Sequence, residues 1–209
     1  MKKIAAGICV ISLFSACVVP VNTSFESARM LNKNNFEISG HYSHYNFSEE
    51  GETETVNDNF GLRLGYGITD WMDVKARYER LNPVDEGSEG VNYLDVAPKF
   101  QILPRYIAGT LPVGLYFADE ETEWVISPKV LFTYPANDIF EVTLATKADI
   151  FPEDEGDVYL GVNLGFGLSS NLNRWALRPE LGLMTDPGES GVAWTFGLGL
   201  SAIIQGSRR

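Results

Sequence analysis

From residue 35 onward, apolar and polar residues alternate with a period of two. In the segment 70–81, for example, Met72 and Val74 lie on one face, and Asp73 and Lys75 lie on the other. Successive side chains of a β-strand point to opposite sides, so this alternation predicts strands with one apolar and one polar face. The segments that show it are 35–47, 57–69, 70–81, 90–102, 105–117, 122–134, 138–150, 157–169, 174–185 and 190–204.

The connections between these segments alternate as well. Short turns lie around 69–70, 103–104, 135–137 and 171–173, and longer loops lie at 48–58, 82–90, 117–123, 151–157 and 186–189. Short connections at one end and long ones at the other are typical of membrane barrels. We therefore expect an all-β fold, an antiparallel up-and-down transmembrane β-barrel of about ten strands, with eight as the alternative count. An even number places both termini at the short-turn end.

Three features indicate that the apolar face is turned to lipid. Each segment has about 12 residues, which crosses the hydrocarbon layer at roughly 3.3 Å per residue and a tilt near 40°. Aromatic residues near strand ends suggest interfacial girdles, namely Tyr66, Trp71, Phe117, Trp124, Tyr134, Phe151, Trp175 and Trp194. The polar face is rich in glycine, which suits a narrow, filled lumen. The alternative is a soluble, lipocalin-like periplasmic barrel that carries an apolar ligand.

The predicted inner face carries equal numbers of cations and carboxylates. They are Arg63, Lys75, Arg77, Lys99, Lys129, Lys147 and Arg178, and Glu37, Asp73, Glu79, Asp95, Glu141, Asp149 and Glu180. Ten strands enclose a narrow interior, where an unpaired charge is costly. We therefore expect these side chains to form an ion-pair network that plugs the barrel. The alternative is a narrow solute channel with a charged constriction.

The N-terminal residues have the features of a secretory signal. Lys2 and Lys3 precede a mostly apolar run, 4–14, which is too short to span a membrane as a helix. The sequence Leu-Phe-Ser-Ala-Cys that ends at Cys17 resembles a bacterial lipobox. This resemblance implies cleavage before Cys17 and attachment of acyl chains such as palmitate to it. Val18 stands where an aspartate would imply retention at the inner membrane, so the resemblance implies the outer membrane.

These features divide the chain into four parts. We expect a signal peptide at 1–16, a lipidated N-terminal linker at 17–34, the barrel at 35–205 and a C-terminal tail at 206–209. In this arrangement Cys17 anchors the chain in the periplasmic leaflet of the outer membrane, and both termini lie in the periplasm.

Charge limits the partners that the chain can bind. The formal net charge of -12 excludes a nucleic-acid binder that works by neutralising phosphates. The five longer loops contain eighteen Asp and Glu residues and neither Lys nor Arg, so divalent cations or basic partners are expected there. Two cysteines are too few for a disulfide framework or a Cys-based zinc site. We find no motif for a cofactor.

One local group of residues suggests catalysis. In His41-Tyr42-Ser43-His44, His41 and Ser43 share a face about 7 Å apart. The pair resembles the His-x-Ser arrangement of outer-membrane lipid hydrolases, so a lipid hydrolase using His41 and Ser43 is a minor alternative. The pair lies on the first strand and faces the predicted lumen, which favours a polar lining instead.

The stretch 60–79 combines a strand, a Gly-Ile-Thr-Asp turn and a second strand. With the rest of 35–204, it resembles small bacterial outer-membrane β-barrel proteins. The resemblance implies a protein embedded in outer-membrane lipids. We expect a non-enzymatic barrel lipoprotein with a structural or surface-interaction role. The narrow channel and the lipocalin-like carrier are the alternatives.

Overall fold

The computed structural model describes residues 19–84, 88–118, 121–153, 157–188 and 190–206. The described residues contain no helix that is long and apolar enough to cross a membrane. Their regular structure consists of the strands β1 (Phe36–Glu49), β2 (Glu52–Gly67), β3 (Met72–Pro83), β4 (Val91–Leu103), β5 (Ile107–Thr110), β6 (Val113–Ala118), β7 (Glu121–Ile126), β8 (Lys129–Pro135), β9 (Phe140–Phe151), β10 (Asp157–Leu168), β11 (Trp175–Thr185) and β12 (Val192–Ile204).

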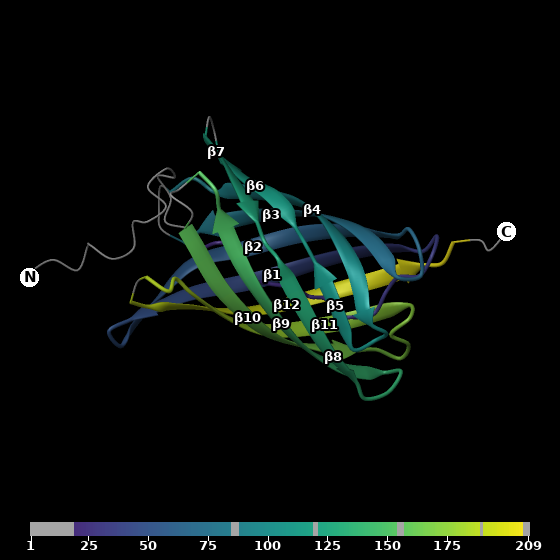
Figure 1. The fold of residues 1–209 in the computed structure, drawn as a ribbon. Helices are drawn as coiled ribbons and strands as arrows, with labels where there is room; N and C mark the ends of the chain where they lie inside the picture. The colour runs from purple at the N-terminus through teal and green to yellow at the C-terminus, as the bar shows by residue number, and fades with distance from the viewer. Residues whose placement is uncertain (1–18, 85–87, 119–120, 154–156, 189, 207–209) are drawn as a thin grey trace, which may run out of the picture.

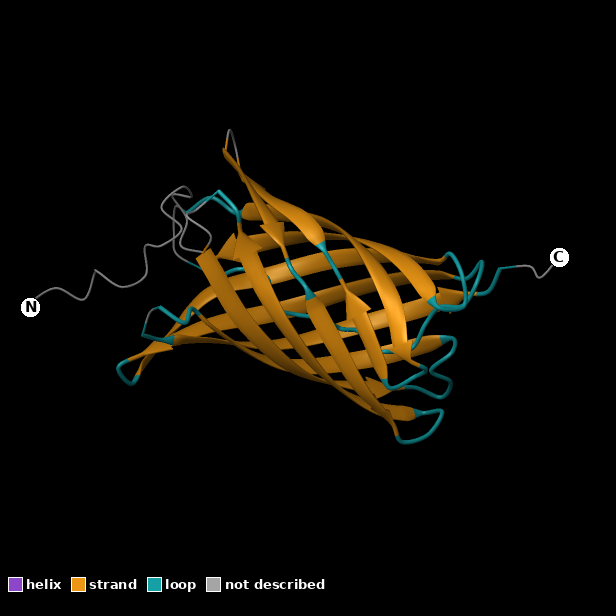
Figure 2. Cartoon of the chain, viewed as in Figure 1, coloured by secondary structure: helices purple, strands orange, loops and turns teal. Residues whose placement is uncertain are grey.

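These strands form one closed antiparallel barrel (Figures 1 and 2). Consecutive strands pair with one another, except β5 with β6 and β7 with β8. β1 pairs with β12 from Phe36↔Ile204 to Ser48↔Val192, which closes the sheet. β5 and β6 lie one after the other along β4, and β7 and β8 lie one after the other along β9. Each of these two pairs occupies one position in the wall, so the prediction of a ten-stranded up-and-down barrel is confirmed.

Two prolines explain why the segments predicted at 105–117 and 122–134 are each divided. Pro112 separates β5 from β6, and Pro128 separates β7 from β8. Proline has no N–H group to donate within a sheet, and the strands end at these two positions. The carbonyl oxygens of both prolines still accept hydrogen bonds from the adjacent wall, Pro112 from the Ser127 N–H at 2.9 Å and Pro128 from the Ala148 N–H at 3.1 Å. β4 and β11, in contrast, continue through Pro98 and Pro179.

The first of the predicted long loops, 48–58, is mostly strand. β1 runs to Glu49 and β2 begins at Glu52, so only Glu50 and Gly51 form the turn. Their φ angles of 51° and 89° are the left-handed values that a two-residue hairpin turn requires. The acidic residues around this turn therefore extend the barrel wall as a hairpin.

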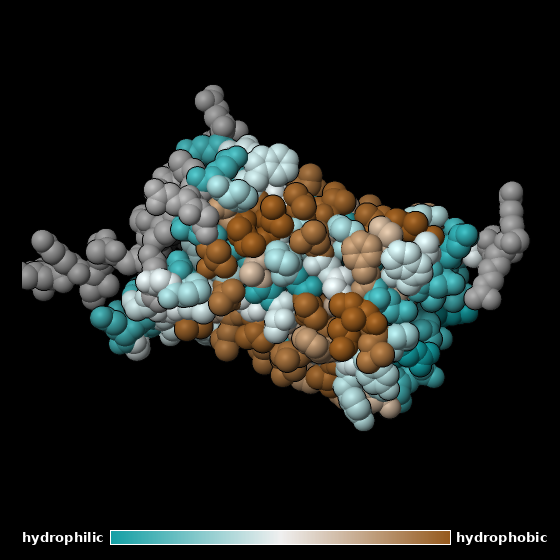
Figure 3. Space-filling view, viewed as in Figure 1, coloured by the Kyte–Doolittle hydropathy of each residue, from teal (hydrophilic) through white to brown (hydrophobic). Residues whose placement is uncertain are grey.

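The apolar face of the barrel points outward, as predicted. Leu160, Leu164 and Leu181 on β10 and β11 are 46%, 40% and 52% exposed. Figure 3 shows apolar residues gathered in a band between two hydrophilic ends. A lipocalin-like carrier would have these side chains turned inward, so the structure overturns that alternative. Of the predicted girdle residues, Trp71 and Tyr134 are exposed, whereas Phe151 is buried in the lumen and is not part of a girdle.

Residues 19–34, which we call the luminal segment, run through the inside of the barrel. They form neither helix nor strand; residues 20–28, 30 and 31 are buried, whereas 32–34 are exposed where the segment leaves the lumen. The segment meets β1 at the short-turn end, whereas Val19 lies near the long-loop end and donates a hydrogen bond to Asn57. We expected the N-terminal part of the chain at the short-turn end, whereas Val19, the first described residue, lies at the opposite end. Cys17 itself lies outside the described residues.

The outward orientation predicts how a charge on the wall affects stability. Leu164→Arg places a cation in the middle of β10 facing lipid, and we expect it to lower the free energy of unfolding by about 2–4 kcal/mol. Urea unfolding in lipid vesicles, followed by tryptophan fluorescence, measures this change. Glu54→Arg, at an exposed position of the β1–β2 hairpin, is the control and should leave stability unchanged. Equal stability of the two variants would contradict a lipid-facing Leu164.

Candidate functional site

The structure places thirteen of the fourteen charged residues predicted for the lumen in buried positions on the inner wall, with at most 9% of each residue exposed. They come from β2, β3, β4, β8, β9 and β11 and are Arg63, Asp73, Lys75, Arg77, Glu79, Asp95, Lys99, Lys129, Glu141, Lys147, Asp149, Arg178 and Glu180. The fourteenth, Glu37 of β1, is partly exposed and lies 2.8 Å from Lys75. The wall thus surrounds the luminal segment with charged groups.

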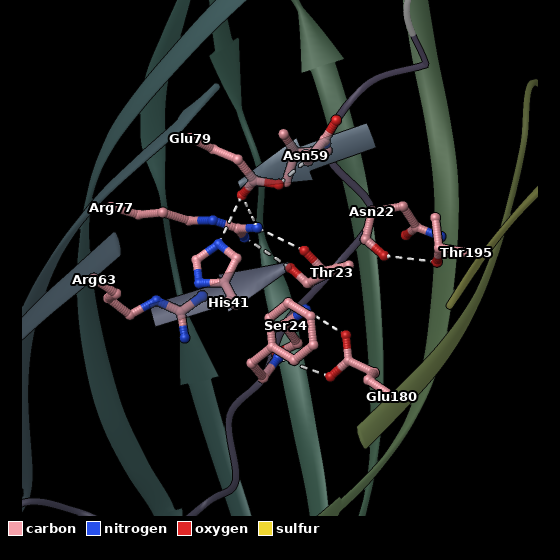
Figure 4. Close-up of polar contacts among 12 residues, drawn as sticks. Asn22, Thr23, Ser24, His41, Asn59, Arg63, Arg77, Glu79, Glu180 and Thr195 are labelled. Atoms are coloured by element: carbon pink, nitrogen blue, oxygen red, sulfur yellow. Dashed lines mark hydrogen bonds and ion pairs between the residues drawn. The ribbon is translucent and has the colours of Figure 1, made fainter. Parts of the chain in front are cut away.

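Several of these charged groups bind the backbone of the luminal segment. The carboxylate of Glu180 accepts hydrogen bonds from the N–H groups of Ser24 and Phe25, at 2.6 and 2.7 Å. Arg77 donates to the carbonyl oxygen and the hydroxyl of Thr23, at 2.8 and 2.6 Å. These contacts lie side by side in Figure 4. They supply the partners that a buried chain without secondary structure needs.

The same arrangement continues along the segment toward the short-turn end. Lys99 donates to the carbonyl oxygens of Ser27 and Arg29, both at 2.7 Å. The hydroxyl of Thr133 accepts from the N–H group of Ala28, at 2.7 Å. Side chains of the wall therefore provide the hydrogen-bond partners that neighbouring backbone groups provide in a sheet or a helix.

Two charged side chains of the luminal segment complete the ion pairs of the wall. Glu26 lies 3.1 Å from Lys75 and 3.5 Å from Arg63. Arg29 contacts Glu141 at 2.5 Å, and Arg178 contacts the same carboxylate at 3.1 Å. The sequence led us to expect wall charges paired with one another, and pairs such as Arg178–Glu141 do occur. The structure adds the luminal segment as a second set of partners.

Glycines of the inner wall make room for this segment. A Cβ atom at Gly199 would lie 3.1 Å from the ring of Phe25, and one at Gly197 would collide with that ring. At Gly161 a Cβ atom would come within 2.5 Å of the side chain of Asn22. The glycine-rich inner face was predicted to accommodate other side chains, and many of these belong to the luminal segment.

The two ends of the lumen differ in chemistry. At the long-loop end, Val21 packs in an apolar cluster that we call the collar, which consists of Val21, Leu81, Val91, Tyr93, Tyr116, Val125 and Phe151. At the short-turn end, a polar cavity of about 860 Å³ lies between the luminal segment and the wall, and Arg29, Lys33 and Glu37 are among its lining residues. The long-loop end of the lumen is therefore packed with apolar side chains around Val21, and the short-turn end contains a polar cavity.

The candidate catalytic pair is not assembled. His41 Nε2 lies 3.0 Å from the carboxylate of Glu79, and its ring packs against Phe25 with 5.0 Å between ring centroids. The Ser43 hydroxyl is buried and has no hydrogen-bond partner among the described residues. A serine nucleophile needs a base within hydrogen-bond reach and access to substrate. Here the histidine is bonded to Glu79 instead, and the luminal segment covers it.

Sequence reasoning missed the luminal residues of this site, above all Glu26 and Arg29. They lie in a stretch without periodicity, so no pattern assigned them to the barrel. The glycines of the inner face were an indirect signal, because they implied that something fills the lumen. Within the described residues, no group of three or more His, Cys, Asp or Glu side chains is arranged to hold a metal ion.

Comparisons with known proteins show a likeness of fold. An outer membrane channel from Pseudomonas putida F1 aligns with a TM-score of 0.51 and 11% identity, covering 90% of this chain and 100% of the channel. The translocator domain of the autotransporter NalP from Neisseria meningitidis aligns with a TM-score of 0.48 and 7% identity. This alignment covers 82% of this chain and 89% of the NalP domain. Ail, the attachment invasion locus protein of Yersinia pestis, aligns with a TM-score of 0.39 and 11% identity. This alignment covers 82% of this chain and 99% of Ail. No family model and no curated protein sequence matches. The chain thus has the fold of outer-membrane β-barrels.

The contacts of Glu180 predict its effect on the luminal segment. Glu180→Ala leaves two buried N–H groups without an acceptor, each at a cost of about 1–3 kcal/mol. We expect faster amide hydrogen exchange at Ser24 and Phe25, measured by mass spectrometry or NMR in detergent micelles. Glu54→Ala, at an exposed position, is the control and should leave this exchange unchanged. Unchanged exchange in Glu180→Ala would show that the segment is not held by this carboxylate.

Proposed function

We propose that this protein is a sealed, non-catalytic barrel of the bacterial outer membrane with a structural or surface-interaction role. The observation that carries the proposal is the luminal segment, which fills the lumen and is bound along its length by wall residues such as Glu180, Arg77 and Lys99. A protein with a filled lumen acts through its outer surface and its loops.

Charge favours the long-loop end as the interacting surface. Glu52, Glu54, Glu121 and Glu153 are exposed there, and the five loops of that end carry no Lys or Arg. Such a surface attracts cations and repels anions. The partners proposed for it are divalent cations or basic macromolecules, whereas the wall itself contacts outer-membrane lipids.

The alternative function is a narrow solute channel. The polar cavity at the short-turn end supports it, because that cavity reaches inward to Lys75, Lys99 and Arg178. The collar at the other end opposes it, because Tyr93, Tyr116 and Phe151 pack together around Val21. Passage would require the luminal segment to leave its site.

Conductance across planar lipid bilayers distinguishes a sealed barrel from a channel. The native protein should show no steady ion current, because the luminal segment occupies the path. Replacement of residues 19–34 by Gly and Ser at equal length removes the specific contacts, and we expect it to produce discrete openings.

The control for this experiment is Glu54→Ala, which changes the acidic rim and leaves the lumen intact. Heat-modifiable migration in gel electrophoresis shows that each variant is folded. Steady, ion-selective openings of the native protein, altered by Lys75→Ala or Arg77→Ala, would contradict the sealed barrel and establish the channel.

Acylation of Cys17 is part of the same proposal. The lipobox-like sequence that ends at Cys17 supports it, and several acyl chains on one residue provide a firm membrane anchor. Cells grown with an alkyne-bearing palmitate analogue should incorporate the label into the native chain. Cys17→Ser should abolish the label. An unlabelled native chain would show that Cys17 is not acylated.

A further inference from the structure

The contacts of the luminal segment define its direction through the barrel. Val21 donates to the hydroxyl of Tyr116 at 2.9 Å, near the long-loop end. At the short-turn end, the backbone N–H of Leu31 donates to the carboxylate of Asp73 at 3.1 Å. The backbone N–H of Lys33 donates to the carboxylate of Asp70, in the β2–β3 turn, also at 3.1 Å. Between these points the residue numbers increase steadily from one end of the lumen to the other. The chain therefore enters β1 after crossing the whole barrel.

Val19 lies at the mouth of the long-loop end. Its N–H group donates to Asn57 of β2 at 3.2 Å, and Val21 packs in the collar with Leu81, Val91 and Phe151, residues at strand ends beside the long connections. Only Val18 lies between Cys17 and Val19, and these two steps of the chain reach at most about 7 Å. The first described residue, Val19, thus lies at the long-loop end, within that reach of Cys17.

Specific contacts fix the direction in which the luminal segment runs through the barrel. A segment that only filled the space could run either way. Buried charges contact particular atoms of the segment: Glu180 accepts from two N–H groups, whereas Arg77 and Lys99 donate to carbonyl oxygens. Glu26 meets Lys75, and Arg29 meets Glu141. A segment that ran the other way, or that stayed outside the barrel, would leave these charges without these partners.

We propose that the chain leaves the barrel at the cell surface, so that acyl chains on Cys17 enter the outer leaflet beside the long acidic loops. Long loops of outer-membrane barrels face the exterior, and short turns face the periplasm. The C-terminal end of β12 lies at the short-turn end, opposite Val19 (Figure 1). The protein would then span the membrane with its barrel and also be anchored from the outside. The position of the acyl chains depends on the acylation proposed above, whereas the position of the chain end does not.

Epitope accessibility on intact cells tests the exit. One variant carries an epitope between Val18 and Val19, a second between Glu50 and Gly51 in the β1–β2 hairpin, and a third after Arg209. We expect antibody to label the first two on intact cells as strongly as on permeabilised cells. The third should be labelled only after permeabilisation. Heat-modifiable migration confirms that each variant is folded.

A second measurement follows the acyl chains. The variant with a site-specific protease sequence between Val18 and Val19 is labelled with the alkyne-bearing palmitate analogue. Protease added to intact cells should remove the fatty-acid label from the barrel. The same sequence placed after Arg209 is the control and should remain uncut.

Two outcomes would overturn the proposal. An N-terminal epitope reached only after permeabilisation, with the hairpin epitope reached on intact cells, would show that the chain does not cross the barrel. Surface labelling of the C-terminal epitope alone would show that the barrel has the opposite orientation. Absence of the fatty-acid label would refute acylation of Cys17, and the epitopes would still decide where the chain leaves the barrel.

Discussion

The structure depends on the pairing of buried charges with a chain that has no secondary structure of its own. A ten-stranded barrel encloses a narrow interior in which isolated charges and free peptide groups are both costly. Here the buried charges and the free peptide groups are partners of one another, because Glu180 and Lys99 bind peptide groups of the luminal segment. The ion pairs of Glu26 and Arg29 complete the arrangement. The proposal of a sealed lumen rests on these contacts.

This pairing also gives the two ends of the barrel different properties. The collar around Val21 is apolar and lies at the acidic, long-loop end. The cavity at the short-turn end is polar and includes Arg29 and Lys33. These two ends are the basis of the proposed structural or surface role, and the polar cavity is the basis of the alternative, a narrow channel.

Much of the fold was predictable because side-chain direction in a strand is a local property. Alternation along 157–169 placed Leu160 and Leu164 on one face. The length of the segments, the aromatic residues near strand ends and the glycines of the polar face then indicated that the apolar face points outward, as it does. The alternation did not predict that the segments 105–117 and 122–134 are each divided into two strands, at Pro112 and Pro128. It also failed at Glu50 and Gly51, where two left-handed residues continue a hairpin in place of a long loop.

The sequence by itself determined the strands and the separation of an apolar from a charged face, because both depend on a period of two. Segment length and the placement of aromatic residues and glycines favoured an outward apolar face. Only the tertiary structure decided what fills the lumen and where Val19 lies. The luminal segment has no periodicity, and its partners are distant in the chain: Ser24 and Glu180 are 156 positions apart. A local sequence pattern does not encode contacts between residues so far apart in the chain.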